Sequence, residues 1–168
     1  SDDIFELEAL TNLVKITVDS LIILNNLELT SLSGLRNARL ALSGYLFIAS
    51  NSKLKTLAGL EGINKIGEYA GESIWIQENP ALVSISALGV IRGELPGSVR
   101  IVNNVALLSL EGLEGITGIS SAAATITAVN NGSGFTFDQT DYMGAVDPDA
   151  ANAWWSGWTL PGTVAVSE

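Results

Sequence analysis

The sequence predicts a mostly β protein in which short strands stack into a parallel solenoid, and two repeating patterns predict it. Short segments with alternating apolar residues, such as LFIAS before Asn51, have the period of a half-buried β-strand. Apolar residues at every third position then follow, a spacing that suits a chain turning corners around a flattened coil. The run after Asn51 consists of Leu54, Leu57, Leu60, Ile63 and Ile66. One coil cannot bury its own inner face, so the coils are expected to stack.

Four complete copies of this pattern are anchored at Asn26, Asn51, Asn79 and Asn104, with separations of 25, 28 and 25 residues. The longer separation contains the insertion GEYAGES at 67–73. Two partial copies flank these, one containing Leu7, Leu10, Leu13 and Ile16, the other Ile126, Ala128 and Asn131. We therefore expect about five coils, with residues 1–133 as the solenoid and 134–168 as a separate C-terminal tail.

An asparagine follows each predicted strand, where the backbone must bend. Its amide can satisfy backbone groups that the bend leaves unpaired, so the asparagines should form a structural ladder along the stack. Its members would be Asn26, Asn51, Asn79, Asn104 and Asn131. A ligand-binding role is the alternative, but the asparagines recur in register with the core leucines, which favours the structural one.

Composition excludes several classes of function. The 168 residues are 47% apolar, with 18 acidic against 8 basic side chains, so nucleic acid would be repelled. The chain has no cysteine and no histidine, which removes disulfides, thiolate chemistry and the commonest general base. No apolar run is long enough for a transmembrane segment. The chain opens with SDDIFELEAL instead of a leader, which indicates processing or trimming.

Two groups of carboxylates are candidates for chemistry. Glu111 and Glu114 could pair as acid and base, but their register predicts a solvent-facing arc without the burial that tunes a catalytic pKa. Calcium could bind the acidic tail, but a solvated turn fits its spacing better than a calcium loop. The residues in question are Asp138, Asp141, Asp147 and Asp149. We expect no enzyme activity, no cofactor and no metal site.

The repeats resemble a known family. The phrases LTSLSGL, LKTLAGLEGI and LLSLEGLEGI, preceded by a strand and Asn as in LFIASN and VRIVNN, are similar to the receptor L-domain type of leucine-rich repeat. The resemblance covers roughly residues 7–131. It implies a right-handed solenoid with one parallel sheet, short helices or turns opposite, and a recognition role. The disulfides of the animal receptor form are lacking, so a bacterial secreted or surface protein fits better.

The tail is not part of the repeat. Its segments FTFDQTDYMGAV and WWSGWT are rich in aromatic residues, which suit a plug over the last coil of an open-ended solenoid. The predicted cap comprises Phe135, Phe137, Tyr142, Trp154, Trp155 and Trp158. A sugar platform or an assembly surface is the alternative for these rings.

The outward positions of the strands predict a partner-binding stripe. If the residues five and three before each asparagine point inward, those six, four and two before it point outward. The stripe is unusually apolar and carries aromatic and arginine side chains, the usual anchors of interfaces. Its residues are Ile22, Leu24, Tyr45, Phe47, Trp75, Gln77 and Arg100. The same rule places outward Ser20, Ala49, Ser73, Ser98, Val102, Thr125, Thr127 and Val129.

An alternative interpretation is that the insertion, the tail or another copy of the chain covers this stripe. The leading hypothesis for function is a secreted or surface-attached, non-enzymatic module for recognition or adhesion that binds a protein or glycan through its strand face. The second hypothesis is a self-assembling subunit of a surface filament or other homopolymer.

Overall fold

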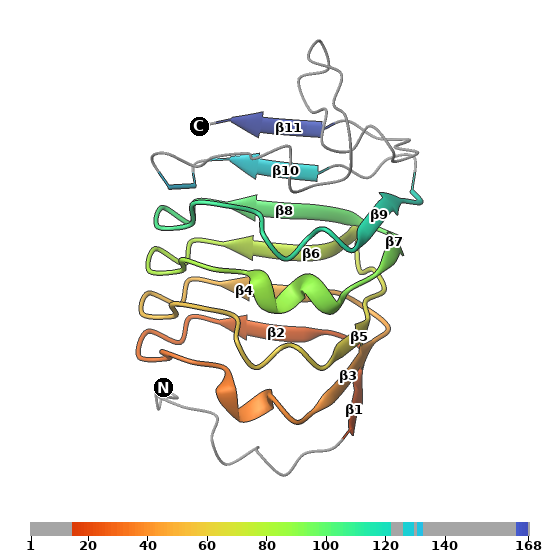
Figure 1. Ribbon diagram of the computed structural model, residues 1–168, viewed down its shortest axis with the longest axis horizontal. Coiled ribbons are helices and arrows are strands. Elements are labelled where there is room, and N and C mark those ends of the chain that lie inside the picture. Colours follow the sequence, from red (N-terminus) through yellow and green to blue (C-terminus); the bar gives the residue numbers. More distant parts are fainter. Residues whose placement is uncertain (1–14, 122–125, 130, 133–163, 168) are drawn as a thin grey trace.

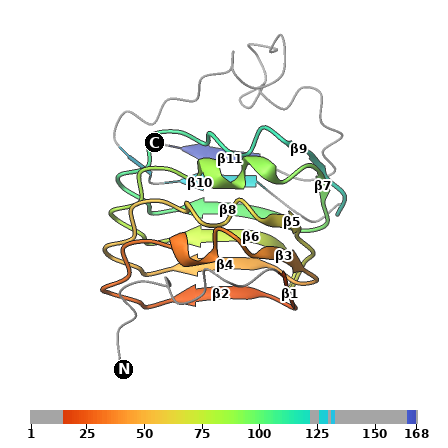
Figure 2. The same ribbon diagram turned by 60° about the horizontal axis from the view of Figure 1, so that its bottom comes forward.

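The protein is a β-solenoid of about four turns with almost no helix. The computed structural model describes residues 15–121, 126–129, 131–132 and 164–167. Successive coils lie on top of one another, so that strands far apart in sequence become neighbours (Figure 1). The view turned by 60° shows the same pile of coils, with the long sheet along one side (Figure 2). The mostly β solenoid that the repeats predict is confirmed.

One side of every coil contributes a strand to a six-stranded parallel sheet. The strands lie in the order β11-β10-β8-β6-β4-β2, and their arrowheads all point the same way (Figure 1). Their bounds are β2 Leu21–Leu24, β4 Leu46–Ala49, β6 Glu72–Gln77, β8 Ser98–Val102, β10 Ile126–Val129 and β11 Val164–Ser167. The last of these, β11, comes from the tail and pairs in parallel with β10.

A second side of the coils carries further short strands that the repeats did not predict. Three of them form the sheet β1-β3-β5 and two form the pair β7-β9. Their bounds are β1 Lys15–Val18, β3 Arg39–Leu42, β5 Ile63–Lys65, β7 Gly93–Leu95 and β9 Ile116–Ile119. The remaining side has turns and the short 3-10 helices η2 (Ser33–Leu35) and η3 (Ser86–Val90), as expected opposite a sheet.

The apolar residues at every third position form the core. They are buried in one continuous cluster together with the inward residues of the main sheet, such as Leu46, Ile48, Ile74 and Ile76. The run after Asn51 is representative, because each of its five members is at most 6% exposed. The interior therefore has the composition that the spacing predicts.

The asparagines at the strand ends are linked from coil to coil. The Oδ1 atom of Asn79 accepts hydrogen bonds from the backbone N–H and the side-chain amide of Asn51, both at 3.1 Å. The Asn79 amide nitrogen in turn donates to the carbonyls of Ile48 (3.1 Å) and Gln77 (2.9 Å) and to Oδ1 of Asn104. The same pattern links Asn26 to Asn51 and Asn104 to Asn131. These bonds satisfy backbone groups that the bend removes from the sheet.

Glycine lets adjacent coils come close together opposite the sheet. Gly59 has φ of 115°, and a Cβ atom there would lie 1.9 Å from the carbonyl oxygen of Leu32, just before η2. Gly112 has φ of 111° and stands in the same relation to Ile85, just before η3. Only glycine combines this conformation with this proximity.

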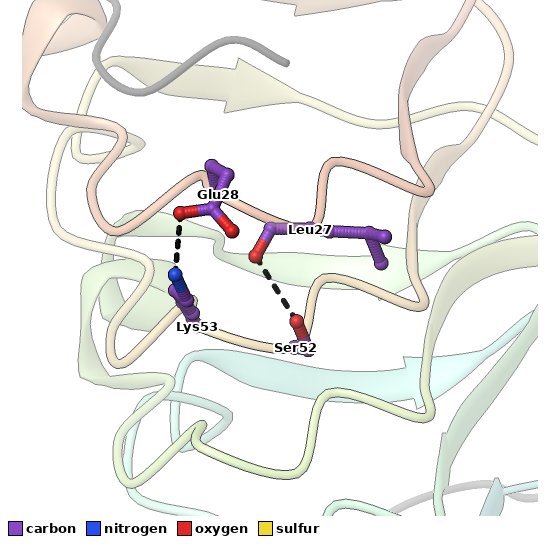
Figure 3. A network of polar contacts seen from close by, with 4 residues as sticks. All are labelled: Leu27, Glu28, Ser52 and Lys53. Atoms are coloured by element: carbon purple, nitrogen blue, oxygen red, sulfur yellow. Dashed lines mark hydrogen bonds and ion pairs between the residues drawn. The ribbon is translucent and has the colours of Figure 1, made fainter. Parts of the chain in front are cut away.

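Polar contacts also connect the coils at the exposed corner after the asparagines. Lys53 forms an ion pair with Glu28 of the preceding coil, and the Ser52 hydroxyl donates to the carbonyl of Leu27 at 3.0 Å (Figure 3). These side chains lie outside the core, so their contacts support the register without determining it.

Candidate functional site

The register of the main sheet brings the predicted stripe together. Parallel pairing aligns Ile22 with Phe47, Phe47 with Trp75, and Trp75 with Arg100, so these side chains form one row across four strands. Because the core sits on the opposite face, this row lies on the outer surface of the sheet. Leu24 and Gln77 belong to the next row toward the strand ends.

Aromatic rings are packed against one another along this face. Ring centroids are 5.9 Å apart for Tyr45 and Phe47 and 4.9 Å apart for Phe47 and Trp75. Tyr69, from the insertion at 67–73, lies 5.4 Å from Tyr45 in a stacked arrangement. We call Tyr69, Tyr45, Phe47 and Trp75 the aromatic stack. The Tyr45–Phe47 and Tyr45–Tyr69 pairs are stacked, whereas Phe47 and Trp75 are tilted by 40°. Aromatic pairs at these separations stabilise a surface beyond the burial of their area.

The face is only partly covered by the described residues. Ile22 is 53% exposed and Leu24 is 43% exposed, while Tyr45, Phe47 and Trp75 are half-buried. Tyr69 covers the Tyr45 end of the stack, yet is itself 64% exposed. Within the part of the chain that the structure describes, the insertion thus extends the apolar surface at its edge and leaves Ile22 and Leu24 open.

A tight hairpin explains how the insertion reaches the face. Tyr69 and Glu72 exchange both backbone hydrogen bonds, at 2.9 and 3.0 Å. The two residues between them have positive φ, 52° at Ala70 and 85° at Gly71, as in the turns that connect hairpins of this length. The turn places Tyr69 beside the first residues of β4 and β6.

The same insertion changes the register, so that the outward prediction for Ser73 was wrong. A bulge lies between Glu72 and Ile74, and Glu72 rather than Ser73 takes the position beside Ser98. Ser73 is fully buried, where its hydroxyl donates to the Gly67 carbonyl (2.7 Å) and accepts from the Gly97 N–H (2.8 Å). An extra residue in one strand moves the side chains before it to the opposite face of the sheet.

Glu72, which the alternation did not predict, therefore joins the surface. Nη1 of Arg100 lies 3.4 Å from Oε1 of Glu72, and the guanidinium lies 4.9 Å from the centroid of the Trp75 ring. Burial raises the pKa of the Glu72 carboxyl, and the bond to Arg100 and its charge oppose that shift. Oε2 of Glu72 and Nε of Arg100 have no hydrogen-bond partner among the described residues. The indole N–H of Trp75 donates to Oε1 of Gln77 at 2.7 Å.

The remaining outward predictions have mixed outcomes. Two of them were wrong, because the side chains are not exposed. Ala49 is fully buried, since its short methyl group lies between the longer side chains of Leu24 and Gln77 in the same row. Ser98 is only 7% exposed. Half-buried positions are occupied by Ser20, Val102 and Thr127. The side chains of Thr125 and Val129 lie outside the described part of the structure.

A second exposed apolar group was missed by the sequence reasoning. Leu27, Val83, Val105 and Leu108 are 51–59% exposed. We call these four residues the corner group. They follow a ladder asparagine by one or four positions, and that recurrence is the signal that could have identified them.

The two carboxylates that could pair as acid and base, Glu111 and Glu114, lie in different surroundings. Glu111 is exposed, and the Glu114 carboxylate accepts the N–H of Gly112 at 2.8–2.9 Å. Glu61 does the same to the N–H of Gly59 at 2.7 Å. This recurrence indicates that Glu114 stabilises a turn.

Several predictions concern residues outside the described part. The acidic residues Asp138, Asp141, Asp147 and Asp149, and the cap residues Phe135, Phe137, Tyr142, Trp154, Trp155 and Trp158, all lie there. Within the described ranges, no cluster of three or more metal-ligating side chains occurs. The helices found in those ranges are short turns, and none has the length and hydropathy needed to cross a bilayer.

Comparisons with protein-family models, with curated proteins and with solved structures found no match.

Proposed function

We propose that this chain is a non-enzymatic recognition module that binds a protein partner through the outer face of its six-stranded sheet. The observation that carries the proposal is the aromatic stack, which lies across adjacent strands beside the exposed Ile22 and Leu24. Contiguous apolar surface of this kind is typical of contact sites, and aromatic and arginine side chains contribute most of the energy there.

The packing of the rings favours a protein over a glycan. A sugar binds an aromatic platform by laying its C–H face on a free ring face. Here Tyr45 is stacked against both Phe47 and Tyr69, and the guanidinium of Arg100 lies over the Trp75 ring, so these rings already contact other side chains. The accessible surface beside these rings is aliphatic, at Ile22 and Leu24, and suits apolar side chains of another protein.

The setting we propose is outside the cell or on its surface. This part of the proposal rests on the resemblance of the repeats to the receptor L-domain type of leucine-rich repeat. The resemblance also supports a module for recognition or adhesion, because that family consists mainly of such modules.

A self-assembling structural subunit is the second candidate. Among the described strands, β2 and β11 lie at the two ends of the sheet and have a single neighbour each. Edge strands that lack a partner can pair with another chain, and pairing of β11 with β2 of a second copy would generate an open fibre. Light scattering after size-exclusion chromatography separates the candidates. A monomer at all concentrations contradicts the fibre, and polymers that grow with concentration contradict the monomeric module.

Selection from a random displayed peptide library tests the leading proposal. We expect the wild-type chain to enrich a family of peptides whose binding is lost in Phe47→Ser. The matched control is Val83→Ser, which removes an equally apolar side chain from the corner group and should retain the peptides. Peptides that bind both variants equally, or no enrichment at all, would contradict a binding role of the strand face. A glycan array probed with the same variants tests the glycan alternative. Glycan binding that is lost in Phe47→Ser would identify the partner as a sugar instead of a protein.

A further inference from the structure

An open groove lies where the apolar face meets the starts of the first strands. It has a volume of about 520 Å³, and its lining includes Asp19, Ser20, Ile22, Tyr45, Glu68 and Tyr69. Two stacked tyrosine rings thus stand beside two carboxylates, and Ile22 belongs both to the groove and to the exposed row of the sheet.

The charged side chains that the structure describes in this groove are both carboxylates. Asp19 and Glu68 are exposed, and none of the described residues that line the groove is basic. The ion pairs among the described residues are Lys53 with Glu28 and Arg100 with Glu72, so neither groove carboxylate belongs to one. The Ser43 hydroxyl donates to Oδ1 of Asp19 at 3.0 Å, which orients that carboxylate without neutralising it.

The opposite end of the apolar face also carries an acid. Glu78 follows β6, and its carboxylate accepts a hydrogen bond from Ser50 at 3.1 Å. Arg100 is the only basic side chain in the described rows of the face, and it already contacts Glu72 and Trp75. The open part of the face is therefore apolar in its middle and acidic at both ends.

From this charge pattern we propose that the groove receives a basic side chain, lysine or arginine, from the protein partner, while adjacent apolar side chains of that partner lie on Ile22, Leu24 and Phe47. The inference rests on the proposed function and adds the chemistry of the partner. A cation in the groove has carboxylates for charge-assisted hydrogen bonds and tyrosine rings for a cation–π contact. The same negative charge disfavours partners with acidic contact surfaces.

Nuclear magnetic resonance titration of the whole chain with a defined probe tests this inference. The probe is the acetylated and amidated pentapeptide Ala-Leu-Arg-Leu-Ala, and its control is the same peptide with citrulline, which keeps the shape of arginine without its charge. We expect saturable shifts at the backbone amides of Ser20, Tyr45 and Tyr69. We also expect affinity about twofold to fivefold weaker for the citrulline peptide, since one exposed charged contact is removed.

Variants of the protein give the matching test. The double substitution Asp19→Asn with Glu68→Gln should weaken binding of the arginine peptide by a similar factor and leave the citrulline peptide unaffected. Glu111→Gln, an exposed carboxylate outside the sheet face, should change neither affinity. Rising salt should weaken the arginine peptide alone.

The failures of this inference and of the proposed function are distinguishable. Equal affinity of the two peptides, absence of binding, or binding insensitive to the double substitution would overturn the cation groove. The proposed function would still stand if the displayed library had yielded Phe47-dependent peptides without basic residues.

Discussion

The guanidinium of Arg100 lies 4.9 Å from the centroid of the Trp75 ring and 3.4 Å, through Nη1, from Oε1 of Glu72. One side chain on β8 thus contacts both an aromatic ring and a carboxylate on β6. Trp75 and Arg100 are paired in register, and Glu72 joins them through the bulge that follows the hairpin. The charged end of the aromatic stack therefore depends on the insertion.

This arrangement predicts a specific pH dependence of stability. Burial raises the pKa of Glu72 above its ordinary value of 4.5, so the folded state holds the proton more tightly than the unfolded state. The resulting stabilisation is fully present below pH 4.5 and is lost as the pH rises through the raised pKa. Urea unfolding across this range should show Glu72→Gln gaining stability relative to wild type as the pH increases.

Arg100→Met provides the complementary change. Removing the positive charge should raise the pKa of Glu72 further, and the loss of stability with rising pH should become larger than in wild type. If the free energy of unfolding changed with pH in the same way in the variant and in wild type, the interaction between Arg100 and Glu72 would not affect the pKa of Glu72 in solution.

The asparagine ladder predicts a graded series. Asn79→Ala removes a side chain with five hydrogen bonds from a buried site and should lower the free energy of unfolding by about 3 kcal/mol. Asn79→Asp should lower the free energy of unfolding even more at neutral pH, because a carboxylate would face the Ile48 and Gln77 carbonyls without a proton to donate. Asn26→Ala, at the partly exposed end of the ladder, is the control and should cost less. Equal losses in all three would contradict the ladder.

Two glycines with positive φ separate backbone strain from steric contact. Gly59→Ala would place Cβ 1.9 Å from the Leu32 carbonyl oxygen and force adjacent coils apart, so we expect a loss of about 3 kcal/mol or more. Gly71 has φ of 85° with nothing within 4 Å, so Gly71→Ala should cost only the conformational strain, about 1 kcal/mol. Chemical denaturation of both variants measures the difference, and similar values would show that the coils are not in close contact at Gly59.

The hairpin that carries Tyr69 predicts a stabilising substitution. Ala70 has φ of 52°, a conformation that asparagine adopts more readily than alanine, and asparagine followed by glycine is the preferred pair in such turns. Ala70→Asn should raise the free energy of unfolding by about 0.5 kcal/mol. A lower thermal midpoint would indicate that the turn has a different geometry.

The repeat made the core and the ladder predictable, because every coil solves the same packing problem with the same residues at the same spacing. Leu57 and Asn79 could be placed without coordinates for that reason. Ser73 could not, since alternation assumes one residue per register position and the bulge breaks that rule. β11 is similar: Val164 and Val166 alternate, but four residues far from the last repeat do not indicate which strand they join.

The sequence predicted most residues of the candidate surface, but not how their side chains pack. Outward alternation identified Phe47, Trp75 and Arg100, whose row the register then brings together. The ring packing and the contribution of Tyr69 depend on the path of the hairpin, which a single sequence does not specify. Glu72 was missed because the bulge exchanged its position with that of its neighbour.

Hydroxyl-radical footprinting of the chain, with and without a library-selected peptide, tests the central claim most directly. The account predicts that bound peptide protects Ile22, Tyr45, Phe47 and Trp75 from oxidation and leaves Val83 and Leu108 of the corner group unchanged. Protection confined to the corner group, with the aromatic stack as reactive as in the free chain, would contradict it.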